Sequence, residues 1–245
     1  MRTPDIAVVT GAASGVGSAT VAALRASGVG VVTVDLVPAE AGDRVVVGDV
    51  AAPATWAAVL EASRELGGAP TKLVLNAAKL VVGTVLEVSE EDLRSVFEVN
   101  VLGAYQALHA CLPVMIENGG GSVVTVASID ALVAEQGLAA YCASKGALLQ
   151  LTRCVAVDHG RQGIRANCVC PTAIDTPFFR QHVDAAPDPA AFLAEKSGRH
   201  PSGRILQSEE VANTICFLLS DASSGMNGAA VTVDGGLLAS FDFQA

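Results

Sequence analysis

The first fold signal in the sequence is the stretch Ile6-Ala-Val-Val-Thr10, followed directly by Gly11-Ala-Ala-Ser-Gly15-Val-Gly17. The first five residues form a short apolar run, which is typical of a buried strand. The glycines that follow allow a tight turn, and the small residues of 16–26 are compatible with a helix. Strand, glycine-rich turn and helix in this order predict the first unit of an α/β sheet.

Further apolar runs alternate with helical patterns along the rest of the chain. Strands are predicted at 29–34, 45–47, 72–75, 122–126, 164–169 and 229–233, and helices at 53–66, at 89–117 with a bend or break at Pro113, at 138–159 and from Ser208 onward. The segment 174–206 contains four prolines and is expected to be irregular. We therefore expect one domain over residues 1–245, an α/β, Rossmann-type doubly wound parallel sheet of about seven strands with helices on both faces.

Composition and charge exclude several classes of protein. The net charge is -10 and basic residues are sparse, which argues against a nucleic-acid-binding surface. Neither the six cysteines nor the four histidines show the spacing of metal ligands, so no metal site and reduced thiols are expected. The uncharged run of residues 6–24 is interrupted by three glycines, and we do not expect residues 1–24 to act as a signal peptide. We expect no membrane span and a cytoplasmic location.

The glycine-rich turn is a candidate site for a dinucleotide. Backbone N–H groups at a helix N-terminus can bind a pyrophosphate, and glycines keep side chains out of its way. The spacing is not G-x-G-x-x-G, so the glycines alone would also fit an ordinary strand-to-helix turn.

Asp35 ends the second predicted strand, 18 residues after Gly17. An acid at this place can accept hydrogen bonds from the ribose hydroxyls and would repel a 2′-phosphate. No Arg or Lys lies beside it, and Ser14, rather than a basic residue, precedes Gly15. These features favour NAD over NADP. Asp49 ends the third strand in a similar way and could reach the adenine.

Tyr141 and Lys145 form a candidate acid/base pair. They lie four residues apart, hence on one helix face, and Lys145 is the only charge between Glu135 and Arg153. A neighbouring ammonium lowers the pKa of a phenol and so makes it a general acid/base near neutral pH. The alternative is a lysine stem packed along the helix with its ammonium in water.

Other polar residues stand where the sheet would present them to a ligand. Ser128 follows the fifth strand and can bind a substrate oxygen, and Asn76 follows the fourth. Asn100 lies within a predicted helix, where it is either an amide that holds a backbone group or water beside Lys145, or a satisfied core amide.

Taken together, the sequence resembles the short-chain dehydrogenase/reductase family over essentially its whole length. The resemblance rests on Thr10-Gly-Ala-Ala-Ser-Gly-Val-Gly17, Asp49, Leu75-Asn-Ala-Ala78, Asn100, Ser128, Tyr141-Cys-Ala-Ser-Lys145, Pro171 to Thr176 and Asp234-Gly-Gly236. It implies four catalytic residues: Tyr141 as acid/base, Ser128 to polarise the substrate oxygen, Lys145 to bind the nicotinamide ribose and lower the pKa of the tyrosine, and Asn100 to hold a water of a proton relay. It also implies a homotetramer.

The resemblance further implies an NAD site in which Ile174 and Thr176 touch the carboxamide and Asp49 and Val50 flank the adenine. The expected cofactor-binding residues are Gly11, Ser14, Gly15, Val16, Gly17, Asp35, Leu36, Asp49, Val50, Asn76, Ala77, Ala78, Tyr141, Lys145, Pro171, Thr172, Ile174 and Thr176. Three departures from the family pattern affect this site. Ala78 stands where the family has glycine, Lys79 follows it and is expected near the substrate entrance, and Thr172 replaces a glycine, which is costly if φ is positive there.

The leading hypothesis is NAD-dependent oxidation of a secondary alcohol, or the reverse reaction on a ketone. Residues 174–206 would form a substrate lid. Phe178, Phe179, Phe192 and Leu193 indicate an apolar or cyclic substrate, whereas Arg180, His182, Arg199 and His200 leave an acidic group open. Two alternatives are a 3-oxoacyl-thioester reductase, against which Asp35 argues, and a non-catalytic NAD(H)-sensing scaffold, against which the presence of both Tyr141 and Lys145 argues.

Overall fold

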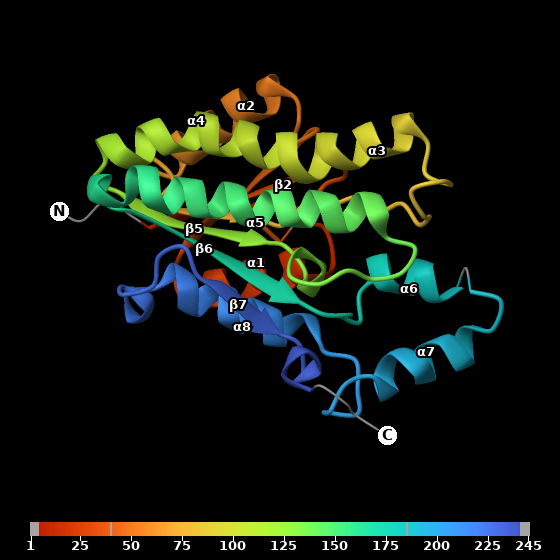
Figure 1. Cartoon of the computed structure of the whole chain (residues 1–245). Coiled ribbons are helices and arrows are strands. Elements are labelled where there is room, and N and C mark those ends of the chain that lie inside the picture. The colour runs from red at the N-terminus through yellow and green to blue at the C-terminus, as the bar shows by residue number, and fades with distance from the viewer. Residues whose placement is uncertain (1–4, 40, 185, 241–245) are drawn as a thin grey trace.

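The centre of the molecule is a seven-stranded parallel sheet (Figure 1). The computed structural model describes residues 5–39, 41–184 and 186–240. The strands, in chain order, are β1 (Ile6–Thr10), β2 (Gly30–Asp35), β3 (Arg44–Val47), β4 (Lys72–Leu75), β5 (Gly121–Val126), β6 (Ile164–Pro171) and β7 (Ala230–Val233). Their order across the sheet is β3-β2-β1-β4-β5-β6-β7, and every neighbouring pair is parallel. The predicted Rossmann-type sheet is confirmed.

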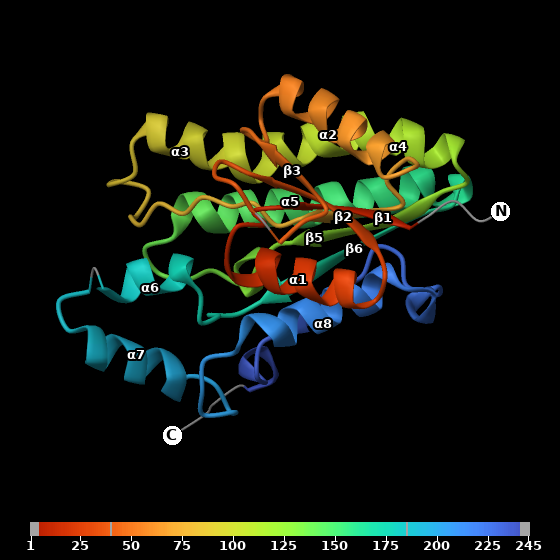
Figure 2. The same cartoon turned by 180° about the vertical axis from the view of Figure 1, so that it is seen from behind.

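Helices cover both faces of the sheet, as Figures 1 and 2 show from opposite sides. One face carries α2 (Pro53–Glu65), α3 (Glu90–Phe97), α4 (Gly103–Glu117) and α5 (Ala139–His159), and the other carries α1 (Gly15–Ala26) and α8 (Ser208–Leu219). Each face has its own cluster of buried apolar side chains, one under α2, α4 and α5 and one under α1 and α8. Short 3₁₀ turns lie at Ile129–Ala131, Gly160–Gln162, Asp221–Ser223 and Leu237–Ala239.

The helix predicted over 89–117 begins as expected but contains a different irregularity. Ser89 caps it by accepting a hydrogen bond from the backbone N–H of Asp92. Of the bend or break expected at Pro113, the break is wrong, because α4 continues through this residue. Pro113 and His109, whose carbonyl loses a donor, are both exposed, so water can reach that carbonyl. The helix instead widens into a π-turn at Glu98–Leu102, between α3 and α4.

By length and composition alone, the run Glu90–Glu117 could cross a membrane. Its apolar residues, however, include the buried side chains of Val96, Ala107, Leu108 and Met115, and α4 packs on α2. Its hydropathy is therefore that of a helix covering a sheet.

Residues 174–206 are more regular than predicted. They contain two helices, α6 (Pro177–Asp184) and α7 (Pro189–Gly198), which project beyond the carboxyl ends of the strands (Figure 1). The prolines begin these helices rather than prevent them, because a proline in the first turn has no N–H to leave unpaired. Asp188 caps α7 by accepting a hydrogen bond from the N–H of Ala191 at 3.0 Å.

The chain changes direction across the sheet next to β1. This strand pairs with β2 on one side and with β4 on the other, so the first crossovers run one way and the later ones run the opposite way. In open α/β sheets, ligands bind outside the carboxyl ends of the strands at such a point. The predicted site residues at the ends of β1, β2, β4 and β5 all lie at this edge.

Candidate active site

The turn after β1 leaves room for a ligand against the backbone. Gly11 has φ +62°, and a Cβ on Gly17 would lie 2.0 Å from the Gly11 carbonyl oxygen, so neither position accepts a side chain. Ser14 stands at the N-cap of α1 but makes no side-chain capping bond, and the first turn of α1 holds no acidic residue. The positive end of this helix therefore faces an open turn, which suits a phosphate group.

A hydrogen-bond network fixes the end of β4 against this turn. The Thr10 hydroxyl accepts from the N–H groups of Asn76 and Ala77 at 2.9 and 3.1 Å. The Asn76 amide donates to the carbonyls of Thr10 and Gly11, both at 3.0 Å. Asn76, predicted from its position after a strand, thus holds two strand ends in register at the ligand edge.

Asp35 lies at the end of β2 beside the same turn. Its carboxylate accepts hydrogen bonds from the N–H groups of Ala13 at 2.9 Å and Leu36 at 2.7 Å. These bonds aim the carboxylate at the open edge of the sheet, where Asp35, Leu36, Asp49 and Val50 line one cavity wall without an Arg or Lys among them.

That cavity has a volume of about 640 Å³ and runs from the glycine turn to helices α6 and α7. It is lined by every predicted site residue except two, namely by Gly11, Ser14, Gly15, Val16, Asp35, Leu36, Asp49, Val50, Asn76, Ala77, Ala78, Ser128, Tyr141, Lys145, Pro171, Thr172, Ile174 and Thr176. Gly17 lies under the turn, where it only provides space, and Asn100 lies behind the cavity wall.

Ser128 is held at the carboxyl end of β5 by its neighbour Asp130. The serine hydroxyl donates to Asp130 Oδ2 at 2.9 Å and accepts from the backbone N–H of Asp130 at 3.1 Å. A longer contact joins it to the Pro171 carbonyl at 3.4 Å. The hydroxyl is buried and lines the cavity.

Tyr141 and Lys145 face the cavity from the first turns of α5. Lys145 is 1% exposed, donates to the Val126 carbonyl at 2.8 Å, and has its Nζ 5.4 Å from the centre of the Tyr141 ring. The alternative of a lysine head in water is therefore wrong.

The predicted lowering of the Tyr141 pKa is also wrong for the protein without a bound molecule. Burial raises the pKa of the phenol above its usual value, and the Asp130 carboxylate raises it further. The ammonium of Lys145 is itself desolvated, and this burial lowers the pKa of Lys145 to about 8. Tyr141 is consequently a protonated phenol, which is the form that can give a proton to a carbonyl oxygen.

Asn100 lies in the π-turn and joins two parts of the site. Its Oδ1 accepts from the N–H of Lys79 at 2.7 Å, and its Nδ2 donates to the Lys79 carbonyl at 2.9 Å and to Ser144 Oγ at 2.9 Å. The side chain thereby fixes the segment after β4 against α5. π-turns occur frequently at functional sites.

The departure at Thr172 causes no backbone strain. No residue other than glycine has a positive φ in the described part of the chain, so the glycine preferred by the family is not required here. The Thr172 hydroxyl instead bonds to His200 Nε2 at 2.8 Å, while His200 Nδ1 bonds to the Lys196 carbonyl at 2.8 Å. The threonine thus ties the end of β6 to the residues after α7.

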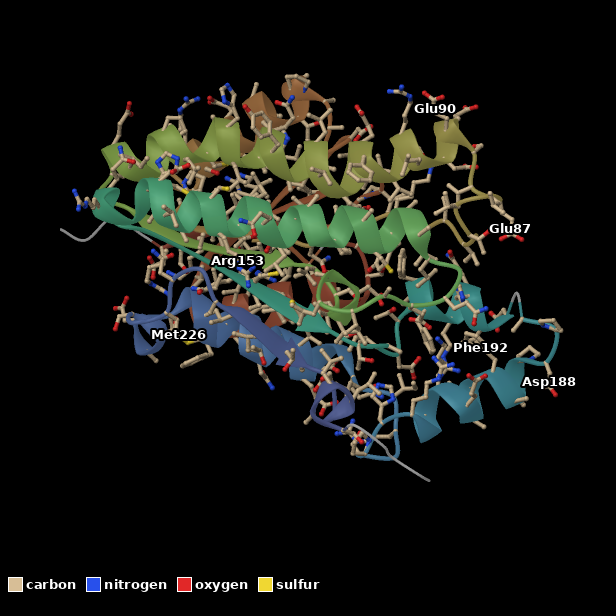
Figure 3. The ribbon with its side chains drawn as sticks, in the orientation of Figure 1. Glu87, Glu90, Arg153, Asp188, Phe192 and Met226 are labelled. Atoms are coloured by element: carbon tan, nitrogen blue, oxygen red, sulfur yellow. The ribbon has the colours of Figure 1, made fainter. Side chains whose placement is uncertain are left out.

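Helices α6 and α7 form the outer wall of the cavity. Phe178, Phe179 and Phe192 line it, and Figure 3 shows Phe192 between the two helices. Glu135, in the loop before α5, pairs with Lys196 of α7 and lies 3.6 Å from Arg199. Two residues that we expected near the substrate are not in the lining: Leu193, and Arg180, which pairs with Asp175 at 2.6 Å. Lys79 is exposed and also lies outside the lining.

Sequence reasoning missed Asp130, Glu135 and Lys196. No local motif marks them, since each acquires its place only when the loop after β5 packs beside α7. One available signal was the acidic residue two positions after Ser128 in an otherwise apolar segment.

The described residues 5–39, 41–184 and 186–240 contain no group of three or more His, Cys, Asp or Glu side chains placed to hold a metal ion. The six cysteines are all free thiols, and Cys168 and Cys170 lie side by side on β6 with their sulfurs 3.8 Å apart.

Comparison with known proteins identifies the family. The sequence pattern of a family described as enoyl-(acyl carrier protein) reductase matches residues 11–238. A relative, carbonyl reductase [NADPH] 2 of Sus scrofa, is 38% identical over 248 residues, with 96% of each chain covered. The chain belongs to the short-chain dehydrogenase/reductase family.

Two further members of the short-chain dehydrogenase/reductase family show the same extent of likeness. The meso-2,3-butanediol dehydrogenase of Serratia marcescens is 34% identical over 246 residues, which cover 96% of this chain and 95% of that one. The ligand-free aldohexose dehydrogenase of Thermoplasma acidophilum superposes with a TM-score of 0.92 at 28% identity, covering 100% of this chain and 98% of that one. The short-chain dehydrogenase/reductase described here is thus an oxidoreductase of alcohols and carbonyl compounds that uses a nicotinamide cofactor.

Proposed function

We propose that this protein is an NAD-dependent enzyme that interconverts a secondary alcohol and its ketone, with Tyr141 as the acid/base. One observation carries the proposal. Ser128, Tyr141 and Lys145 line the same cavity as the glycine turn and Asp35, so the expected catalytic side chains and the expected dinucleotide site share one cavity.

The residues present fit a dinucleotide. Gly11 and Gly17 leave backbone space that a Cβ would fill, and the first turn of α1 offers its N–H groups without a competing acid. Ile174 and Thr176, at the far end of the cavity, would hold the carboxamide, and Asp49 and Val50 would flank the adenine. When bound, the nicotinamide would supply hydride acceptance or donation.

In ketone reduction, Tyr141 would donate its phenolic proton to the substrate oxygen. The Ser128 hydroxyl, which donates to Asp130 Oδ2 in this structure, would turn to donate to that oxygen and hold it in place. The raised pKa of Tyr141 suits this direction, because the phenol stays protonated until the oxygen becomes basic. In alcohol oxidation, the same phenol must lose its proton first. The Lys145 ammonium, 5.4 Å from the ring centre, would stabilise the phenolate electrostatically and hydrogen-bond the ribose.

Asn100 would act chiefly as a positioning residue. Its amide already bonds Lys79 and Ser144, and the remaining lone pair of Oδ1 would be available to a water of the proposed proton relay.

The preference for NAD rests on the wall around Asp35. A ribose with two free hydroxyls can donate to this carboxylate, whereas a 2′-phosphate would meet a negative charge with no Arg or Lys in the adjacent lining. A relative is named as an NADPH reductase, so this preference must come from these residues rather than from the family as a whole.

The outer wall favours a substrate with an apolar or cyclic part. Phe178, Phe179 and Phe192 present rings to the cavity, and α6 and α7 would act as the substrate lid. The cavity is less suited to an acidic substrate. Lys196 pairs with Glu135, Arg199 pairs with Glu195, and both His200 nitrogens are hydrogen-bonded.

Two other functions fit the chain less well. A 3-oxoacyl-thioester reductase draws some support from the family description, which names a reductase of acyl carrier protein substrates. The Asp35 wall, unsuited to NADP, argues against it. A non-catalytic NAD(H) sensor would not require the buried Lys145 beside Tyr141, since burying an ammonium is costly. We further propose a homotetramer, as the family resemblance implies, and, as expected from the sequence, a cytoplasmic location.

The proposal is tested by turnover. The wild-type protein should reduce ketones with NADH and oxidise secondary alcohols with NAD⁺. Tyr141→Phe should retain NADH binding, measured by fluorescence titration, but lose about a thousandfold or more in kcat because it removes the transferable proton. Thr152→Ser, a buried change on the same helix away from the cavity, serves as the control. Near-normal turnover of Tyr141→Phe would remove the tyrosine from its role, and tight NADH binding without any turnover would favour the sensor.

A further inference from the structure

Helix α7 lines the outer part of the cavity without being packed into the core. Phe192, Glu195 and Lys196 belong to its cavity-lining residues, yet none of the residues Pro189–Gly198 is buried. A helix on the surface of a domain is usually held by an apolar stripe that faces the core. Because α7 lacks such a stripe, its position over the cavity depends on contacts at its ends and on side-chain bonds.

The first buried side chain after α7 is His200, which is 2% exposed. Its Nδ1 lies 2.8 Å from the carbonyl oxygen of Lys196, in the last turn of α7. Its Nε2 lies 2.8 Å from the hydroxyl of Thr172, directly after β6. One imidazole ring therefore joins the C-terminal end of α7 to the sheet, and we call these two hydrogen bonds the His200 link.

The directions of the two bonds follow from the groups involved. A carbonyl oxygen only accepts, so Nδ1 carries a proton and donates to Lys196. In a neutral imidazole Nε2 then accepts, and the Thr172 hydroxyl donates to it. Removing that hydroxyl would leave Nε2 as an acceptor without a donor on a buried ring, which is unfavourable.

The His200 link closes the neck of the segment that carries α6 and α7. Ile174 and Leu206 form an isolated parallel β-contact, and the N–H of Asp175 donates to the Leu206 carbonyl at 2.9 Å. The chain thus enters the segment through residues 172–175 and leaves it through residues 200–206, with the two strands of this neck held side by side. Of these contacts, the His200 link is the one that reaches α7 itself.

We propose that His200 and Thr172 are positioning residues, whose hydrogen bond holds α7 over the substrate end of the cavity. This inference rests on the proposed function, because it takes the cavity as the substrate site and α6 and α7 as its lid. The family pattern has glycine in place of Thr172, and glycine has no hydroxyl to offer His200. The departure at Thr172 thereby acquires a use in this chain.

Lys196 connects the His200 link to the cavity. Its carbonyl accepts from His200, while its ammonium pairs with Glu135 and lies 5.3 Å from the centre of the Phe192 ring. A shift in the last turn of α7 would displace all of these groups in the cavity wall. The catalytic side chains stand on β5 and α5, so the shift should weaken substrate binding and leave the chemical step nearly unchanged.

The test uses two amide substitutions that differ in reach. An asparagine amide lies about where Nδ1 of histidine does, and a glutamine amide about where Nε2 does. His200→Asn should therefore lose the bond to Thr172, whereas His200→Gln should keep it. With NADH and the ketone that the wild-type enzyme reduces best, His200→Asn should raise KM about three- to tenfold and change kcat less than about twofold. His200→Gln should stay close to the wild type in both constants.

Limited trypsin digestion without cofactor gives a readout that needs no substrate. Lys196 and Arg199 are cleavage sites at the end of α7, and cutting there requires this end to open. Thr172→Val, like His200→Asn, should be cut there about three- to tenfold faster than the wild type, and Thr172→Ser at the wild-type rate. The double variant of Thr172→Val and His200→Asn should be cut no faster than either single variant, because both break one bond. Cleavage at Arg64, at the end of α2 and outside the cavity lining, is the internal control.

Three results would overturn the inference. The first is a wild-type KM and cleavage rate in His200→Asn or, should that variant not fold, a wild-type cleavage rate in Thr172→Val. The second is an equal rise of KM in His200→Asn and His200→Gln, and the third is faster cutting at Arg64 to the same extent as in α7, which would mean general destabilisation. All three leave the proposed function standing, because the enzyme still reduces ketones. Absence of turnover with every ketone and secondary alcohol would overturn the proposed function and the role of His200 in the reaction, whatever the trypsin result.

Discussion

Asp35 is a single side chain on which the choice between two cofactors depends. Its carboxylate is aimed by the N–H groups of Ala13 and Leu36 and faces a wall free of Arg and Lys. Removing the carboxylate takes away the acceptor for the ribose hydroxyls and also the charge that repels a 2′-phosphate. Both effects lower the preference of the enzyme for NAD over NADP.

Asp35→Ala should therefore lower the ratio of kcat/KM for NAD⁺ over NADP⁺ by about 10- to 100-fold, since hydrogen bonds to a charged group contribute about 1.5–3 kcal/mol. Kinetics with both cofactors at one saturating alcohol concentration measure this ratio. Asp49→Ala is the matched control, because adenine contacts are common to both cofactors and both should weaken alike. A wild-type enzyme that already prefers NADP⁺ would contradict the assignment.

The sequence could predict those site residues whose location follows from their position after a strand or on one face of a helix. Ser128, Tyr141 and Asp35 follow strands or share a helix face, so their convergence follows from a parallel sheet. Asp130 Oδ1 is buried without a hydrogen bond from a described residue, which could not be predicted, because it depends on which donors surround this oxygen after folding. The direction of the Tyr141 pKa shift could not be predicted for the same reason, since burial exceeds the effect of Lys145.

At the scale of elements, sequence patterns located strands and core helices well but misjudged the prolines. Pro113 was expected to bend or break its helix, yet the helix continues through it on an exposed face. Residues 174–206 were expected to be irregular because of their prolines, yet Pro177 and Pro189 begin helices. The π-turn around Asn100 leaves no signal in periodicity, because one extra residue in a turn changes the pattern too little.

The Glu135 pair with Lys196 is a polar link between helix α7 and the rest of the molecule. This pair joins the loop before α5 to α7 at the mouth of the cavity. If α6 and α7 act as a lid, loss of the ion pair between Glu135 and Lys196 should favour the open arrangement of these helices, in which substrate binds less tightly.

Glu135→Gln should raise the KM for the ketone about three- to tenfold while the Kd for NADH changes little, consistent with about 1 kcal/mol for a partly exposed ion pair. Steady-state kinetics at low and at high salt provide the check, because the wild-type KM should approach the variant value as salt screens the pair. Glu61→Gln, which removes a surface pair with Arg64 far from the cavity, should leave KM unchanged. A KM for Glu135→Gln equal to that of the wild type at every salt concentration would show that the pair does not hold the lid.

At the scale of the whole molecule, the fold follows from continuous apolar strands that can be buried only between two helical layers. Into this core the chain places one fully buried lysine. Lys145 donates to the Val126 carbonyl, but burial still lowers its pKa to about 8. A site tuned for chemistry is thus maintained at the expense of stability.

Lys145→Met should consequently make the cofactor-free protein more stable at pH 7 while abolishing turnover. Because the pKa is about 8 in the folded chain and 10.5 unperturbed, the unfolded chain binds more protons between these values, and wild-type stability rises with pH across this window. The gain from the substitution should be largest below pH 8, about 2–3 kcal/mol after the loss of the bond to Val126, and should shrink toward pH 10. Urea unfolding at pH 7 and pH 9.5 measures this gain in stability.

Lys72→Met, which removes an ammonium paired with Asp5 at 2.7 Å, should give no such gain. A Lys145→Met gain of equal size at both pH values would mean that packing, rather than the buried charge, limits the stability of the wild-type enzyme.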